Sequence, residues 1–156
     1  MNVSAVMSRS IFTAHPNTTV KELWRLLFAK HVNAIPVVDK KRLLLGIVTK
    51  EDILRTLYPD YQEYFQDVTS IQDFEEMEEK VAGIGTKKAS DIMCKKVIFT
   101  RVDTPIMRVL SRMIVRSLNQ LPVLSEKDEV IGMVTKGDIF YALFKKRLQK
   151  AKKSKK

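Results

Sequence analysis

Two copies of one segment make up most of the sequence, and they align without a gap at an offset of 86 residues. The clearest match joins GIVTKED at 46–52 to GMVTKGD at 132–138. The same offset aligns Met7 with Met93, Thr18 with Thr104, Asn33 with Asn119 and Pro36 with Pro122. A repeat of this length indicates two copies of one supersecondary unit. With two copies, a pair that covers each other's apolar faces is favoured over an extended solenoid.

Each copy is predicted to contain the elements β-α-β-β-α. The first copy has an extended stretch at 11–14, strands at 35–38 and 43–48, and a second helix at 51–57. The second copy has strands at 121–124 and 130–134 and a second helix at 137–144. The first helix of each copy has the apolar spacing of a helix with one buried face, at Val20, Leu23, Trp24, Leu27 and Phe28, and at Ile106, Val109, Leu110, Met113 and Ile114. The fold class is therefore α/β (α+β).

Threonine and proline residues suggest where these elements begin. Thr18 and Thr104 precede the two first helices and are predicted to be their N-caps, with Pro105 at the first helical position. Pro36 and Pro122 cannot donate to a strand ladder. Each is expected to begin its strand or to lie on an edge.

Charge divides the chain into four parts: a first repeat at 1–58, a connector at 59–88, a second repeat at 89–144 and a tail at 145–156. Residues 59–79 hold eight Asp or Glu and no base, whereas the tail holds eight Lys or Arg and no acid. The connector is predicted to contain a helix that starts with a capping box at Ser70 and Asp73 and ends at Gly83 or Gly85. Its helically spaced apolar residues are Ile71, Phe74, Met77 and Val81. The tail is expected to be disordered, with contact to nucleic acid or another anionic surface as the alternative.

Composition excludes several classes of protein. Forty-five percent hydrophobic and 29% charged residues are typical of a globular protein. No apolar run approaches the roughly 20 residues that span a bilayer, so no membrane partner is expected. The opening MNVSAVMSRS lacks the apolar stretch of a signal peptide, and Cys94 is the single cysteine, so a cytoplasmic location is expected.

The repeated heptapeptide has two compatible interpretations. Thr49 with Asp52, and Thr135 with Asp138, have the spacing of a capping box at the start of the second helix. The same groups can bind a nucleotide, since a helix N-terminus attracts phosphate and an ionised carboxylate accepts from both hydroxyls of a ribose. Gly46 and Gly132 are interpreted as positions where another backbone approaches closely.

The chain resembles a tandem pair of CBS domains, also called a Bateman module. The resemblance covers residues 3–57 and 89–143, and it rests on the two opening segments, the strands IPVVD and LPVLS, and both heptapeptides. It implies a disc in which the repeats are related by a pseudo-twofold axis, with their sheets packed face to face. It also implies two clefts between the repeats that bind an adenosyl ligand such as AMP, ADP, ATP or S-adenosylmethionine, and it implies a homodimer.

The resemblance also implies which residues form the two ligand-binding sites. The first site would use Phe12, Val32, Asn33, Ala34, Ile47, Thr49 and Asp52. The second site would use Ile98, Leu118, Asn119, Gln120, Met133, Thr135 and Asp138. In each site the Thr is assigned to the phosphate and ribose side, the Asp to the ribose diol, and the others to the base pocket.

One departure from the family concerns the residues just before the apolar-Pro strand. Several phosphate-binding members carry His or Arg there, whereas this chain has Asn33-Ala34 and Asn119-Gln120. Neutral residues disfavour tight binding of a triphosphate and leave adenosine recognition intact. Lys50 and Lys136 lie nearby and are predicted to occupy an exposed helical turn.

The sequence does not support a catalytic centre. His15 and His31 are the only histidines, no Cys/His cluster has metal-ligand spacing, and no phosphate-binding P-loop occurs. The chain is therefore predicted to be a stand-alone regulatory, ligand-sensing module that acts on an unidentified protein in trans, and not an enzyme. Two alternatives are a nucleic-acid-binding protein that uses the basic tail and a structural dimerisation module with empty clefts.

Overall fold

The computed structural model describes residues 1–57 and 79–153, and the chain divides into two compact units. One unit is Phe12–Val97. The other combines Met1–Ile11 with Ile98–Lys156. The division is offset from the sequence repeats, because the opening segment of each repeat belongs to the unit that holds the rest of the other repeat.

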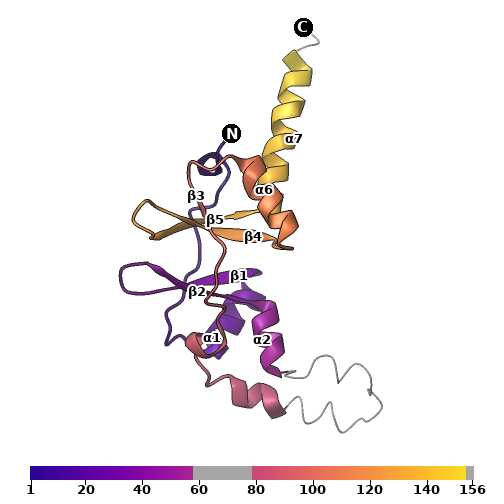
Figure 1. The fold of residues 1–156 in the computed structure, drawn as a ribbon. Coiled ribbons are helices and arrows are strands. Elements are labelled where there is room, and N and C mark those ends of the chain that lie inside the picture. The colour runs from indigo at the N-terminus through magenta and orange to yellow at the C-terminus, as the bar shows by residue number, and fades with distance from the viewer. Residues whose placement is uncertain (58–78, 154–156) are drawn as a thin grey trace. The chain divides into compact units, whose positions relative to one another are not determined.

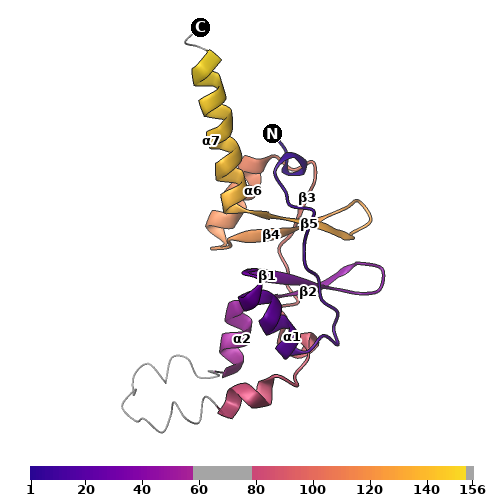
Figure 2. The same ribbon diagram turned by 180° about the vertical axis from the view of Figure 1, so that it is seen from behind.

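The unit Phe12–Val97 is a two-stranded sheet with helices on one face. Its elements are α1 (Val20–Trp24), the π-helix η2 (Arg25–Ala29), β1 (Ala34–Val38), β2 (Leu44–Thr49), α2 (Lys50–Leu57) and α5 (Ala89–Ile92), with a further helical turn over 79–84. Strands β1 and β2 are antiparallel, and α1 and α2 lie on the same face of their sheet (Figure 1, Figure 2). The core between helices and sheet includes the fully buried Leu23, Leu27, Ile35, Val48 and Ile53.

The other unit has a three-stranded sheet with the order β3-β4-β5. Its elements are η1 (Val3–Ala5), β3 (Thr100–Arg101), α6 (Ile106–Val115), β4 (Gln120–Leu124), β5 (Val130–Thr135) and α7 (Lys136–Lys153). Strand β3 is parallel to β4, and β4 is antiparallel to β5. Helices α6 and α7 lie on one face of the sheet (Figure 1), over a core that includes Met113, Leu121, Val134 and Ile139. Val3, from the distant N-terminal segment, is fully buried in the same core.

The two hairpins have the same register, as the repeat predicts. Pro36 pairs with Ile47 as Pro122 pairs with Met133, and the ladder is irregular after Val37 and Val123 alike. Within residues 1–57 and 79–153, four non-glycine residues have positive φ, and they form two pairs at the 86-residue offset: His31 and Ser117 at 53°, and Arg42 and Asp128 at 63°. The repeated sequence therefore specifies the same backbone twice.

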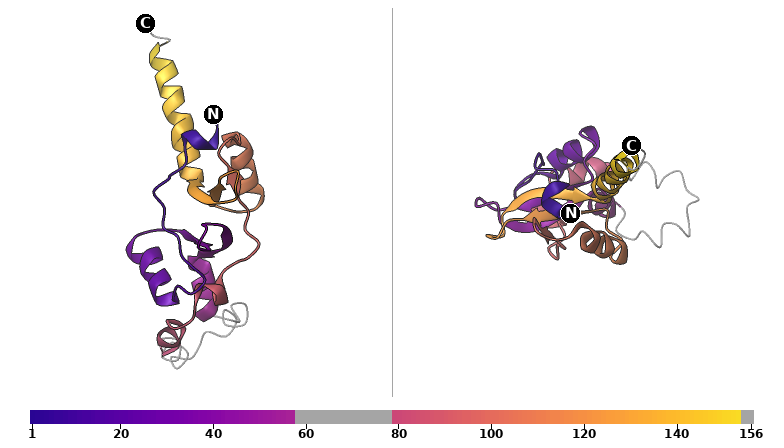
Figure 3. Two further views of the ribbon diagram at one scale, coloured as in Figure 1. Left: turned by 90° about the vertical axis from the view of Figure 1, so that its left-hand side faces the viewer. Right: turned by 90° about the horizontal axis from the view of Figure 1, so that it is seen from above.

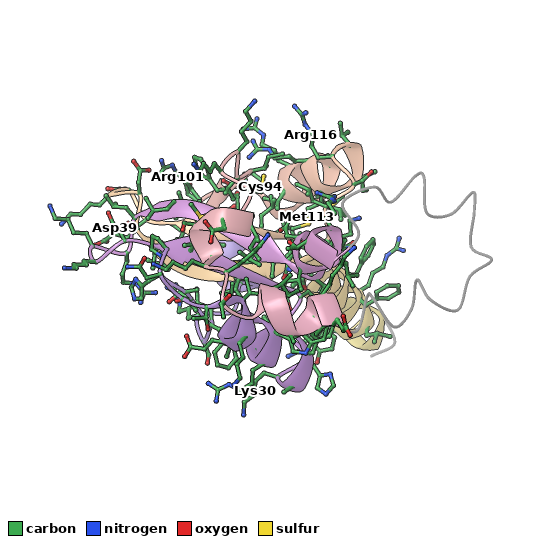
Figure 4. All side chains as sticks on the ribbon, turned by 90° about the horizontal axis from the view of Figure 1, so that it is seen from below. Lys30, Asp39, Cys94, Arg101, Met113 and Arg116 are labelled. Carbon is green, nitrogen blue, oxygen red and sulfur yellow. The ribbon has the colours of Figure 1, made fainter. Side chains whose placement is uncertain are left out.

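A short polar side chain closes each hairpin turn. Asp39 Oδ1 accepts hydrogen bonds from the backbone N–H groups of Lys41 at 2.8 Å and Leu43 at 2.9 Å. Figure 4 shows Asp39 at the tip of the β1–β2 hairpin. In the other hairpin the hydroxyl of Ser125 accepts from the N–H groups of Lys127 and Glu129. Asp and Ser favour such turns because their side chains reach backbone groups a few residues ahead.

The opening segment of each repeat pairs with the last strand of the other repeat. Ile47 on β2 exchanges two backbone hydrogen bonds with Cys94, at 3.0 and 2.9 Å. At equivalent positions, Met133 on β5 exchanges two with Ser8, each at 2.9 Å. The preceding glycines leave room for this approach: a Cβ on Gly46 would lie 2.6 Å from Met93 Sδ, and one on Gly132 would lie 2.6 Å from the Ser8 carbonyl oxygen. The prediction of close backbone approach at both glycines is confirmed.

Two expectations about strands require correction. The stretch 11–14 forms no regular strand, because its pairing is confined to a single parallel bridge between Ala14 and Val37. Pro122 neither begins β4 nor lies on an edge, since β4 is the middle strand of its sheet. Its missing N–H is tolerated because β3 pairs with β4 only from Val123 onward. Pro36 also lies third in its strand, but β1 is an edge strand.

The predicted N-caps are displaced by one residue. Helix α1 is capped by Thr19, whose side chain accepts from the N–H of Glu22, and Pro105 occupies the N-cap position of α6. The hydroxyls of Thr18 and Thr104 instead close the preceding turns. Thr18 accepts from the N–H of His15 at 2.9 Å, and Thr104 accepts from the N–H of Arg101 at 3.4 Å. A threonine hydroxyl can serve either turn, so the sequence alone did not decide between them.

Two members of the predicted apolar stripes are exposed to solvent. Trp24 is 37% exposed, and Ile114 is 60% exposed. After Trp24 the helix widens into the π-helix η2, which rotates the following residues away from a 3.6-residue period. Ile114 lies on the penultimate position of α6, next to Val115, which is also exposed.

The tail differs from the expectation of disorder. Helix α7 continues without a break through Lys153, and Figure 3 shows it extending well past the end of α6. Lys, Arg, Leu, Gln and Ala are good helix formers, and no Gly or Pro interrupts the sequence from 138 to 153. In the connector, the proposed capping box at Ser70 and Asp73 lies outside the described residues. The helical turn over 79–84 ends just before Gly85, as predicted.

Across the ranges 1–57 and 79–153, no helix is long and apolar enough to cross a membrane.

Candidate ligand-binding sites

The first candidate site lies where β2 ends and α2 begins. Asp52 Oδ2 accepts two hydrogen bonds from Thr49, one from its N–H at 2.8 Å and one from its hydroxyl at 3.0 Å. The Thr49 hydroxyl oxygen also lies 3.4 Å from the N–H of Asp52. These are the reciprocal contacts of a capping box, and they fix the carboxylate at the start of the helix.

The second candidate site repeats this geometry where β5 meets α7. Asp138 Oδ2 accepts from the N–H and the hydroxyl of Thr135, each at 2.8 Å. The hydroxyl of Thr135 in turn accepts from the N–H of Asp138 at 3.0 Å. The capping interpretation of Thr-x-x-Asp therefore describes the structure of both copies.

The two oxygens of each aspartate carboxylate have different hydrogen-bond partners. Oδ2 receives two donors from the threonine, so Oδ1 is the oxygen that can accept from a ligand. The proton of each threonine hydroxyl is directed at the aspartate, which leaves none for a phosphate oxygen. Within this structure Thr49 and Thr135 position the carboxylates, and they do not present a donor to a ligand.

Strand β1, which pairs with β2, places part of the predicted base pocket beside Thr49. Ala34, at the start of β1, pairs directly with Thr49. Ile47 lies two residues before Thr49, so the two side chains share one face of β2. Asn33 precedes Ala34 and is exposed, whereas Ala34 is 3% exposed and can offer a ligand mainly its backbone.

The remaining residues of the first site differ in their surroundings. Val32 packs partly buried against the core of its unit. Phe12 is 43% exposed, and it lies at the start of the unit, two residues before the bridge that joins Ala14 to β1. All seven predicted residues of the first site belong to the unit Phe12–Val97.

The second site has equivalent pairing. Gln120, at the start of β4, pairs with Thr135, and the carbonyl of Asn119 accepts from the N–H of Lys136 at 2.9 Å. Leu118 and Ile98 pack partly buried against the core. Met133 is 7% exposed beside Ser8 and so presents little surface to a ligand. All seven predicted residues of this site belong to the unit with Ile98–Lys156.

Three neighbouring side chains were not among the predicted site residues. Arg55 Nη1 lies 3.8 Å from Asp52 Oδ1, so this cation shares the carboxylate oxygen that is available to a ligand. The Asp52 side chain is 12% exposed and that of Arg55 is 74% exposed. Lys50 Nζ lies 5.2 Å from the centre of the Phe28 ring, and Lys136 Nζ lies 3.5 Å from Asn119 Oδ1. The spacing of Arg55, three residues after Asp52 on a helix, is the one signal that could have predicted such a contact.

The described parts of the chain contain no group of three or more His, Cys, Asp or Glu residues arranged to hold a metal ion. The two sites offer hydrogen-bond acceptance by a fixed carboxylate, beside the end of an apolar strand.

Comparison with known proteins identifies the repeated unit. The family model of the CBS domain matches residues 3–59 and again residues 89–145. A CBS domain-containing protein of Dictyostelium discoideum is 31% identical over 144 residues, which are 92% of this chain and 91% of that protein.

Solved structures resemble the chain over nearly its whole length. The CBS domain pair of protein MJ0100, in complex with 5′-methylthioadenosine and S-adenosyl-L-methionine, is 25% identical with a TM-score of 0.70, over 92% of this chain and 99% of that one. The structure of CBSX2 in complex with AMP is 22% identical with a TM-score of 0.73, over 94% of this chain and 98% of that one. The second likeness supports the fold alone.

Proposed function

We propose that this chain, which belongs to the CBS domain family as a tandem pair, is a regulatory module that binds an adenosyl ligand at each Thr-x-x-Asp site. The candidate ligands are AMP, ADP, ATP and S-adenosylmethionine. The observation that carries the proposal is the doubled carboxylate geometry, in which Asp52 and Asp138 are each held by one oxygen and keep Oδ1 for a further contact.

The proposed contact is with the ribose of the ligand. An ionised carboxylate has no donors, so it matches the two hydroxyls of a ribose, both of which donate. Because Thr49 and Thr135 fix the carboxylates before any ligand arrives, the ligand does not need to order them, and less entropy is lost on binding. The adenine ring would lie against the strand starts at Ala34 and Gln120, in part through their backbone groups.

The comparisons support a ligand of this class. Protein MJ0100, which is similar over nearly the whole chain, holds two adenosyl compounds, 5′-methylthioadenosine and S-adenosyl-L-methionine. The neutral residues Asn33-Ala34 and Asn119-Gln120 favour a ligand with few phosphate charges over a triphosphate.

A regulatory role would couple ligand binding to the stability of each unit. A compound that binds only the folded state stabilises it, by about 2.7 kcal/mol at a hundredfold excess over Kd. The sites lie at the junctions β2–α2 and β5–α7, so the carboxylate that would bind the ligand through Oδ1 also fixes the start of a helix through Oδ2. We propose that a protein bound in trans responds to this change, with no catalytic step in this chain.

The test is a titration of the purified chain with AMP, ADP, ATP, S-adenosylmethionine and, as a control for nucleobase identity, GMP. Calorimetry should detect saturable binding of at least one adenosyl compound and none of GMP at the same concentration. If no adenosyl compound binds at millimolar concentration, the Thr-x-x-Asp pairs are helix caps and the proposed function is wrong.

We also propose a homodimer, because helical faces of one unit expose large apolar side chains. On α6, Met107 is 54% exposed and Val115 is 78% exposed, and on α7 Phe144 is 66% exposed. Where large apolar side chains of this kind lie together on a surface, they mark an interaction site more often than they remain in water.

A second candidate function concerns the basic end of α7. The helix continues through Lys153, and residues 145–156 hold eight Lys or Arg and no acid. A helix of this charge can contact the phosphates of nucleic acid, with an affinity that falls as salt rises. This function would be separate from the two Thr-x-x-Asp sites and compatible with them.

A further inference from the structure

The lysine that follows each site threonine has different surroundings in the two repeats. Lys50 and Lys136 occupy equivalent positions, at the first residue of α2 and of α7. Lys50 Nζ lies 5.2 Å from the centre of the Phe28 ring, whereas Lys136 Nζ lies 3.5 Å from Asn119 Oδ1. Asn119 is a predicted site residue and Phe28 is not. Lys136 therefore lies at the edge of the second site, whereas Lys50 contacts a ring on the helical segment η2.

The Lys136 position is also supported by the backbone. The N–H of Lys136 donates to the carbonyl of Asn119 at 2.9 Å, so the start of α7 is tied to the residue before β4. The side-chain contact to Asn119 Oδ1 is long for a hydrogen bond and so is weak. Lys136 can leave Asn119 for a stronger acceptor, such as a phosphate oxygen, at little cost in free energy.

The two sites also differ in the charge of the residue that lies one helical turn after each aspartate. In the first site Arg55 lies 3.8 Å from Asp52 Oδ1, the oxygen that would receive the ribose hydroxyls. The equivalent residue in the second site is Tyr141, which is 71% exposed and carries no charge. The first site therefore has a cation, Arg55, on the oxygen that would bind the ligand, while the cation of the second site, Lys136, contacts Asn119 instead.

The residue that pairs with each site threonine also differs in polarity between the two sites. Ala34 pairs with Thr49 and has no side-chain polar group, whereas Gln120 pairs with Thr135 and adds a polar amide. At this pair of positions the second site is the more polar of the two.

We propose that the two sites select ligands of different charge: the second site binds an adenosine monophosphate through Lys136, and the first site binds an adenosyl compound without a phosphate group. The assignment rests on the proposed function, because it presumes that both carboxylates accept the ribose. A phosphate oxygen bound by Lys136 forms a charge-assisted hydrogen bond, about twice as strong as one between neutral groups. In the first site a phosphate gains such a bond only if Lys50 leaves the Phe28 ring or Arg55 leaves Asp52.

The experiment compares AMP with adenosine, which share the base and ribose and differ only in the phosphate. Two variants isolate the sites: Asp52→Ala leaves the second site, and Asp138→Ala leaves the first. In the Asp52→Ala chain, calorimetry should give a Kd for AMP at least roughly tenfold below that for adenosine, the range expected for a hydrogen bond to a charged group. In the Asp138→Ala chain, AMP should bind no more tightly than adenosine.

Two matched lysine variants then test the assigned cation. Lys136→Met in the Asp52→Ala chain should weaken AMP roughly tenfold and leave adenosine unchanged, and Lys136→Arg, which keeps the charge, should restore AMP binding. Lys50→Met in the Asp138→Ala chain should change neither Kd. A loss of AMP affinity with Lys50→Met, or equal AMP preference in both isolated sites, would overturn the assignment. If AMP and adenosine both fail to bind the unsubstituted chain, the charge selection is wrong, and the proposed function fails with it if ADP, ATP and S-adenosylmethionine do not bind either. If AMP and adenosine bind equally at both sites, the charge selection alone fails.

Discussion

Asp138 accepts two hydrogen bonds from Thr135 at one oxygen: its Oδ2 accepts from the N–H and from the hydroxyl of Thr135, each at 2.8 Å. The hydroxyl also accepts from the N–H of Asp138 at 3.0 Å. Thr49 and Asp52 have the same arrangement, 86 residues earlier. The Thr-Asp pair caps the start of a helix through Oδ2 and leaves Oδ1 for a ligand, so each aspartate has a structural contact and a separate oxygen for the proposed function.

The first prediction concerns the hydroxyl of Thr135. Thr135→Val keeps the shape of the side chain but removes both of its hydrogen bonds with Asp138, and we expect the free energy of unfolding to fall by about 1 kcal/mol, as for loss of other N-cap side chains. Thr135→Ser keeps the hydroxyl and should lie closer to the unsubstituted chain. Urea denaturation of the three proteins measures the difference. Equal midpoints for the Val and Ser variants would show that the hydroxyl does not cap α7.

The second prediction concerns the close approach at Gly132. A Cβ at this position would lie 2.6 Å from the carbonyl oxygen of Ser8, which is itself fixed by pairing with Met133. Backbone must move to admit it, so Gly132→Ala should destabilise the fold by about 1–3 kcal/mol. The same substitution at Gly46 should cost less, because its nearest obstacle, 2.6 Å away, is the flexible side chain of Met93.

A matched control for these two substitutions is Gly83→Ala. Gly83 lies in the helical turn over 79–84, and a Cβ there would meet no atom within 4 Å. Alanine should therefore raise the free energy of unfolding, by up to about 1 kcal/mol. Thermal denaturation orders the three variants. A Gly132→Ala protein as stable as Gly83→Ala would contradict the described pairing of Ser8 with β5.

The third prediction concerns oligomeric state. We expect light scattering at micromolar concentration to give a mass of about twice the 18.0 kDa of one chain. Ile114→Glu places a charge at a residue that is 60% exposed on α6. It should shift the protein toward the monomer while changing the stability of the single chain by no more than about 0.5 kcal/mol. A monomer in the unsubstituted protein would refute the dimer.

The fourth prediction concerns the basic tail. Deleting residues 145–156 removes eight positive charges from the end of α7. If this segment contacts nucleic acid, the deletion should abolish binding to a duplex and its salt dependence, which reflects displaced counterions. The two Thr-x-x-Asp sites lie outside the deleted segment, so adenosyl ligands should bind the shortened chain as before. Unchanged duplex binding after the deletion would refute the role of the tail.

The sequence predicted well those features that depend on residues close together in the chain. The 86-residue offset predicted equivalent hairpins, and the structure confirms it in the registers of Pro36 and Pro122 and in the paired positive φ angles of Arg42 and Asp128. The capping geometry of Thr49 with Asp52 followed from spacing alone, because the contact spans three residues.

Features that depend on distant segments were not accessible in the same way. Nothing local indicates that Ser8 pairs with Met133 and Cys94 with Ile47, since the partners lie far apart in the chain. The contact of Lys50 with the Phe28 ring depends on a side-chain rotamer, which spacing does not determine. The disorder expected for the tail was wrong for residues 145–153, because the good helix propensity of this segment outweighs the repulsion between its charges.

Calorimetric titration of the unsubstituted chain, Asp52→Ala, Asp138→Ala and the double variant with AMP and S-adenosylmethionine tests the central proposal most directly. We predict saturable binding of at least one compound to the unsubstituted chain. Each single variant should lose one site, with affinity at that site at least roughly tenfold weaker, and the double variant should lose both. Binding that survives in the double variant, or no binding to the unsubstituted chain at millimolar concentration, would contradict the assignment of Asp52 and Asp138 as the ligand-binding carboxylates.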